Sequence, residues 1–115
     1  MEKIKLTENK QDKKQPSNLE AEQALLGSIL VNNDIIDEIA NIINPTSFYD
    51  PAHTKIYEVI ETLNNKGMIA NPITLKNFFE NDKDDLNIPD YLIKITKFSS
   101  SSRQAIEYSK LIYDL

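Results

Sequence analysis

Large apolar side chains recur every three or four residues along most of the chain, which is the spacing of α-helices. Residues 18–31 show two apolar arcs on one predicted helix. The bulky arc holds Leu19, Leu25, Leu26, Ile29 and Leu30, and the small arc holds Ala21, Ala24, Gly27, Ser28 and Val31. Two apolar sides predict a central helix, and the small side predicts the close approach of another helix. On this basis we expect Gly27→Leu to be costly, but Gly27→Ala to be mild because alanine is the better helix former.

Polar residues at the start of this helix predict how it begins. Ser17 and Glu20 have the spacing of a capping box, in which each side chain bonds the other residue's backbone N–H. Glu22 falls inside the bulky arc, where an ionised carboxylate must be paired or hydrogen-bonded. We interpret Glu22 as a structural acid, and the alternative is a contact to an arginine or lysine of a partner.

Helix-start signals divide the middle of the chain. A second helix is predicted over about residues 34–43, with Asn33 as its N-cap and an isoleucine-rich stripe. Asp50 and the proline after it begin a third helix, and Gly67 supplies the left-handed residue beyond its end. Phe48 and Tyr49 precede this third helix and are interpreted as plugs for the end of a bundle.

Three shorter helices follow. Asn71 and Pro72 begin a fourth, which is predicted to run to about residue 81. Residues 82–85 are interpreted as a solvated loop, Pro89 opens a fifth helix, and the serines at 99–102 offer N-caps for a sixth that runs to the end. The predicted fold class is therefore all-α, a compact irregular bundle of about six helices.

Charge and composition narrow the class of protein. The 115 residues carry a net charge of −5. Residues 1–15 sum to +2 and predict a disordered polar tail, whereas residues 16–115, the predicted helical interaction domain, sum to −7. Domains that bind nucleic acid alone are usually basic on one face, so this domain is expected to meet a protein. No apolar run approaches the ~20 residues of a membrane span, and a cytoplasmic location is expected.

The sequence offers little catalytic chemistry. It has two glycines and no GxxxxGK[ST] phosphate loop, and it lacks cysteine, so no cofactor, metal or catalytic residue is expected. His53 is the sole histidine, whereas a zinc site needs three or four ligands. We interpret it as a boundary residue that packs on Tyr57 and hydrogen-bonds near the helix start.

The sixth predicted helix is the most suggestive surface. Its charges lie on one narrow stripe, and the other directions are apolar or mildly polar. An apolar arc wider than one core face predicts a second packing surface. The candidate partner or oligomer surface consists of Tyr108, Leu111, Tyr113 and Leu115.

Three blocks in order resemble the N-terminal domain of bacterial replicative DNA helicases of the DnaB type. Those begin with proline, then Glu-Ala-Glu, a small residue, leucine, glycine and an aliphatic run, as residues 16–31 do. The second block runs from Phe48-Tyr49 through His53 and Tyr57 to Gly67 and residues 73–75. The third pairs Tyr91-Leu92 with a late alanine, tyrosine and isoleucine. The blocks cover nearly the whole chain from Pro16.

This resemblance implies a fragment of a longer, hexameric, ATP-driven helicase. The motor, with its ATP and magnesium, would lie beyond residue 115, and DNA would be met only through the full ring. This domain would form part of the collar, which contacts other helicase subunits, primase and, in some species, a helicase loader. Two alternatives remain open: the helicase-interacting domain of primase, and a small helical DNA-binding domain.

Overall fold

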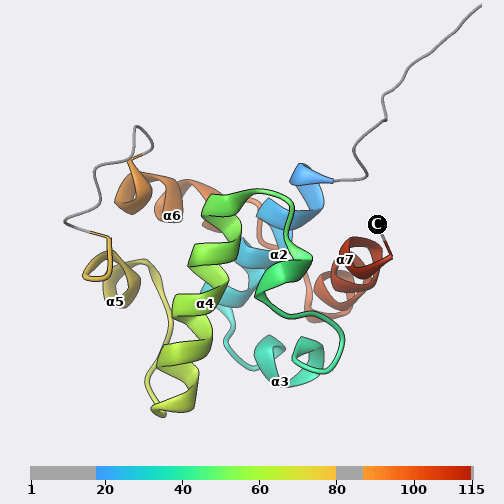
Figure 1. Cartoon of the computed structure of the whole chain (residues 1–115), viewed down its shortest axis with the longest axis horizontal. Coiled ribbons are helices and arrows are strands. Elements are labelled where there is room, and N and C mark those ends of the chain that lie inside the picture. The colour runs from blue at the N-terminus through green and yellow to red at the C-terminus, as the bar shows by residue number, and fades with distance from the viewer. Residues whose placement is uncertain (1–17, 80–86, 115) are drawn as a thin grey trace, which may run out of the picture.

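The computed structural model describes residues 18–79 and 87–114 and shows an all-α fold (Figure 1). Within these residues there is no strand, and the predicted class of six α-helices is confirmed. The helices are α2 (Leu19–Val31), α3 (Ile35–Ile39), α4 (Pro51–Asn65), α5 (Pro72–Lys76), α6 (Ile88–Thr96) and α7 (Ser102–Tyr113), and a 3₁₀ turn, η1, spans Pro45–Ser47.

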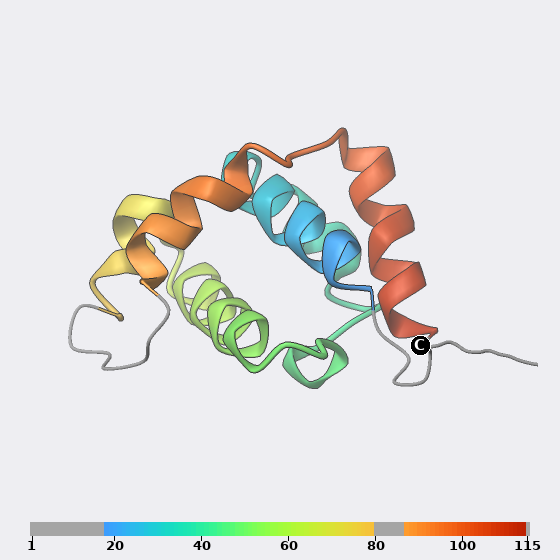
Figure 2. The ribbon, with the colours of Figure 1, turned by 90° about the horizontal axis from the view of Figure 1, so that it is seen from above.

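Helix α2 is the centre of the bundle. Figure 2 shows it between α4 and α7, with α6 and the α6–α7 connection passing along another side. Every residue from Ala24 to Leu30 is buried, and the large apolar side chains that the helix exposes, Leu19 and Val31, are at its two ends. The two apolar arcs therefore predicted its position correctly, because a helix needs neighbours on both sides to bury them.

Gly27 lies where α2 passes the end of α6. A Cβ atom built on Gly27 would stand 1.9 Å from the carbonyl oxygen of Ile95. The expectation that Gly27→Ala would be mild is therefore wrong, because the obstacle is backbone and cannot rotate away as a side chain does. The next residue, Ser28, accepts the Ser100 N–H at 2.8 Å and donates to the Ala24 carbonyl at 2.7 Å, which anchors the α6–α7 connection.

The N-cap of α2 differs from the prediction. Asn18, not Ser17, caps the helix, with its side-chain oxygen accepting the Ala21 N–H at 3.0 Å. Asparagine caps a helix as well as serine does, so the sequence offered two adjacent candidates. Ser17 itself lies outside the described residues, while Glu20 is exposed in the first turn.

Helix α3 is shorter than predicted, and Asn33 is not its N-cap. The cap position belongs to Asp34, which makes no side-chain cap bond. The Asn33 amide instead pairs with the backbone of Ala70, donating to its carbonyl and accepting its N–H, both at 2.8 Å. Ala70 lies in the non-helical stretch between α4 and α5, so its backbone groups need partners that its own segment does not supply.

The proline and glycine signals placed the next helices well. Asp50 caps α4 by accepting the Ala52 N–H at 2.8 Å, and Gly67 beyond its end has a φ of 73°. Helix α5 begins at Pro72 as predicted but ends at Lys76, after which two turn bonds of the i→i−3 kind carry the chain to the buried Phe79. The predicted loop at 82–85 and the tail at 1–15 lie outside the described residues.

Candidate functional site

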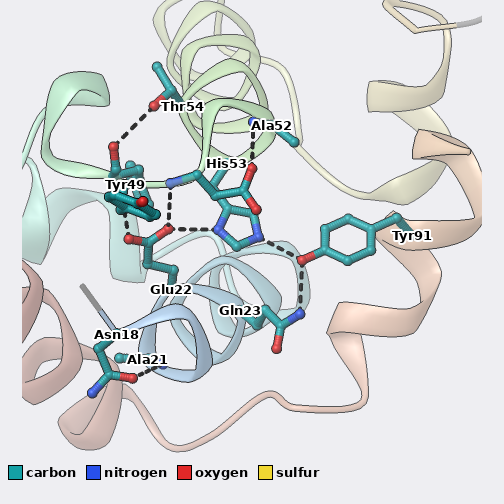
Figure 3. Close-up of polar contacts among 11 residues, drawn as sticks. Asn18, Ala21, Glu22, Gln23, Tyr49, Ala52, His53, Thr54 and Tyr91 are labelled. Atoms are coloured by element: carbon teal, nitrogen blue, oxygen red, sulfur yellow. Dashed lines mark hydrogen bonds and ion pairs between the residues drawn. The ribbon is translucent and has the colours of Figure 1, made fainter. Parts of the chain in front are cut away.

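A buried polar network lies where α2, α4 and α6 meet (Figure 3). Its centre is the Glu22 carboxylate of α2, which is 1% exposed. One carboxylate oxygen accepts the Tyr49 N–H at 2.8 Å. The other accepts the Asp50 N–H at 3.4 Å and lies 2.7 Å from Nδ1 of His53. The carboxylate therefore finds its donors inside the fold, as the interpretation of a structural acid requires.

His53 extends the network from α4 to α6. Its Nε2 lies 2.6 Å from the Tyr91 hydroxyl, which in turn accepts from the Gln23 amide at 3.0 Å. A carboxylate only accepts, so we assign the neutral imidazole its proton on Nδ1, and Nε2 then accepts from the Tyr91 O–H. Gln23 donates to Tyr91, Tyr91 donates to His53, and His53 donates to Glu22, so each donor meets an acceptor.

Ring packing holds the histidine in this orientation. The imidazole stacks on the Tyr91 ring with centroids 5.8 Å apart and 16° between the planes, and it meets Phe48 edge-on at 6.4 Å. His53 is 1% exposed, so its interpretation as a boundary residue is wrong. The ring that stacks on His53, Tyr91, is 38 residues away in the sequence, so the periodicity of one helix could not predict this contact.

The ionisation of Tyr91 fits a structural donor. Burial raises the pKa of its hydroxyl above the ordinary value, the nearby carboxylates of Asp50 and Glu22 raise it further, and the bond from Gln23 lowers it. A phenol with a raised pKa keeps its proton at neutral pH and is a poor nucleophile.

Tyr57 is the one buried side chain of the described part whose polar atom has no hydrogen-bond partner. Its ring is fully buried and packs against Phe48 at 5.2 Å. Burial, together with the negative charge of Glu61, raises the pKa of Tyr57 to about 12. A neutral, unpaired hydroxyl in the core is a local cost to stability.

A groove of about 470 Å³ opens between the start of α2, the α6–α7 connection and α7. It brings together two of the four predicted surface residues, Tyr108 and Leu111, with small and polar residues of α2. Its lining consists of Asn18, Glu20, Ala21, Gln23, Ala24, Phe98, Ser100, Tyr108 and Leu111. Tyr113, 66% exposed, is not among the lining residues, and Leu115 lies outside the described residues.

Several contributors to these sites were not identified from the sequence. Gln23 and Tyr91 complete the polar network, and Phe98 supplies an exposed ring to the groove. The one sequence signal for the network was Glu22, because a carboxylate in an apolar arc needs hydrogen-bond donors. The sequence does not show which segments supply them. In the described residues no group of three histidine, cysteine or acidic side chains is placed to hold a metal. Nor is any described helix long and apolar enough to cross a membrane.

The model of the DnaB-like helicase N-terminal domain family matches residues 14–114. The chain belongs to this family. The "Replicative DNA helicase DnaB" of Rickettsia bellii is 41% identical over 102 residues, covering 87% of this chain and 20% of that protein. The "Replicative DNA helicase DnaC" of Bacillus subtilis is 26% identical over 109 residues, covering 93% of this chain and 24% of that protein.

A solved structure agrees with the family assignment. The crystal structure of the N-terminal domain of DnaB helicase from Mycobacterium tuberculosis matches with a TM-score of 0.77 at 27% identity. The match covers 86% of this chain and 73% of that one. This DnaB-like domain spans about a fifth of the length of the Rickettsia bellii relative.

Proposed function

We propose that this DnaB-like domain is the collar of a replicative DNA helicase, an interaction module through which a longer parent assembles as a hexamer and receives primase. The parent would unwind DNA with ATP and magnesium held by a motor outside these residues. A helicase loader is a further expected partner, and DNA would be met through the whole ring. The family match and the relatives' names support the parent's identity.

The outward side of α7 is the observation that carries the interaction role. Ala105, Ser109 and Ile112 are buried, so one side of α7 already serves the core. Leu111 and Tyr113 are nevertheless 42% and 66% exposed. Aromatic and aliphatic side chains that remain outside the core are typical of the centre of protein interfaces. The acidic charge of residues 16–115 also favours a protein partner over nucleic acid.

Replacement of Tyr113 in the full-length helicase tests this role. We expect Tyr113→Ser to weaken the hexamer and the binding of primase, measured by sedimentation velocity with and without the primase's helicase-binding domain. Tyr49→Ser is the matched control, since Tyr49 is 48% exposed and lies on the segment before α4. Unchanged assembly and unchanged primase binding in the Tyr113 variant would refute the proposal for α7.

A further inference from the structure

The groove between α2 and α7 has two large apolar side chains in its lining that the described residues leave partly exposed, Phe98 and Leu111. Ala21 and Ala24 contribute small side chains from α2, and Phe98 and Leu111 face them from the other side. Phe98 is 44% exposed and Leu111 is 42% exposed. Large apolar groups grouped around a concave site favour a bound apolar ligand or peptide segment. The question is which segment has the chemistry and the position to fill it.

The sequence before α2 is opposite in net charge to the rest of the chain, and its apolar pattern suits the groove. Residues 1–15 carry +2, whereas residues 16–115 carry −7, and Glu20 lies on the groove. Apart from Met1, the large apolar side chains of residues 1–15 are Ile4 and Leu6. At a spacing of two, an extended chain presents both on the same side. A basic segment with one apolar side complements an apolar groove on an acidic domain.

We propose that residues 1–15 occupy this groove in the same molecule, with Ile4 and Leu6 on the apolar surface formed by α2 and α7. Asn18, the first described residue, lies on the groove, so the segment is attached at the site it would fill. The 12 residues from Leu6 to Asn18 span roughly 20 Å as a flexible chain, which is enough to fold back. Tethering of this kind gives an effective concentration on the order of 1 mM, so even weak binding is populated.

Occupation in the same molecule has a regulatory consequence. Any partner that uses Leu111 or Phe98 must first displace the segment, so residues 1–15 act as a built-in competitor. The competition depends on salt, because screening weakens the attraction between a basic segment and an acidic surface. This role is separate from the outward position of Tyr113, which does not line the groove.

A single spin label tests the contact in the whole chain. The protein has no cysteine, so Lys5→Cys provides one attachment point for a nitroxide. We expect strong paramagnetic broadening of the amide signals of Ser100 and Leu111, and none at Ile69, whose exposed side chain lies on the turn between α4 and α5. High salt should reduce the broadening. Broadening spread evenly over the surface would contradict the proposal.

Two paired variants separate docking from mere proximity of a tethered label. With Ile4→Ser and Leu6→Ser added to the labelled chain, the occupancy of the groove should fall at least about tenfold, because two large apolar side chains no longer leave water. Asn9→Ser and Gln11→Ser, the matched control, should leave the broadening unchanged. Equal broadening in all three chains would overturn the proposal. So would broadening of an isotope-labelled chain by spin-labelled second copies, which would make a neighbouring molecule the source.

Discussion

At the scale of single residues, the fold depends on hydrogen bonds between buried polar groups, which the periodicity of the sequence does not reveal. Glu22 sits in an apolar arc and is tolerated because donors converge on it, two from the backbone before α4 and one from His53. His53 completes its own bonding only by reaching Tyr91 on α6. The network ties three helices together with directional bonds, where apolar packing alone specifies orientation less sharply.

Removal of the histidine should therefore cost more than its packing volume. His53→Leu leaves the Glu22 carboxylate without one donor and the Tyr91 hydroxyl without its acceptor, so we expect a loss of about 3 kcal/mol in the free energy of unfolding. Urea denaturation followed by circular dichroism measures it. The neighbouring Thr54→Val is the control, since the Thr54 side chain makes one long bond, of 3.4 Å, to the Phe48 carbonyl. Equal stability of the two variants would show that the network adds nothing.

Tyr57 gives the opposite expectation. Tyr57→Phe keeps the buried ring and removes the unpaired hydroxyl, so we expect stability to be unchanged or to rise by up to about 1 kcal/mol at pH 7. Because the folded-state pKa is raised to about 12 from 10, the unfolded chain ionises first, and stability falls as the pH rises from 10 toward 12. Urea melts at pH 7 and pH 11 should show a smaller alkaline loss in the variant. A clear destabilisation at pH 7 would indicate a hydrogen bond to this hydroxyl.

At the scale of elements, local signals fixed the starts of helices better than their ends. Asp50-Pro51, Asn71-Pro72 and Gly67 act through their own backbone geometry, so their roles could be predicted from the sequence. The pairing of Asn33 with Ala70 joins segments 37 residues apart, which no local signal could reveal. The same limit applies to the site: Glu22 and His53 were singled out, but Tyr91 was not identified as the second partner of His53.

The crossing of α2 and α6 yields a sharp test at this scale. Gly27→Ala gains helix propensity, yet its methyl group would meet the Ile95 carbonyl, so we expect a net loss of roughly 1–3 kcal/mol, and more for Gly27→Leu. Thermal melting measures both. Val31→Ala on the same helix is the control, because Val31 is 62% exposed. A Gly27→Ala variant as stable as the unsubstituted chain would mean that α2 and α6 are not in contact there.

At the scale of the whole molecule, the described residues form an all-α bundle that leaves one side of α7 exposed. The polar network joins α2, α4 and α6, while Tyr113 of α7 remains outside the core. The sequence predicted apolar side chains outside the core on α7, since its charges occupy one narrow stripe, and Leu111 and Tyr113 are exposed. It could not anticipate the groove, because that site needs α2, α7 and the connection between α6 and α7 at once.

The isolated chain should bind neither nucleotide nor DNA. It lacks a phosphate-cradling loop, and its acidic balance disfavours phosphate contacts. Calorimetry with ATP and magnesium should give no saturable heat, and a fluorescently labelled duplex should show no shift that depends on salt. A dissociation constant for ATP in the low micromolar range would contradict the placement of the motor outside these residues.

Self-association of the chain tests most directly whether α7 presents an interaction surface. Leu111 lies outside the buried core at 42% exposed, so Leu111→Glu should leave the circular dichroism spectrum unchanged. Across a concentration series, sedimentation should show the unsubstituted chain as a monomer or a weak, concentration-dependent dimer. Where a dimer forms, the variant should associate less. A tight hexamer formed by this chain alone, or association that Leu111→Glu does not alter, would contradict the account.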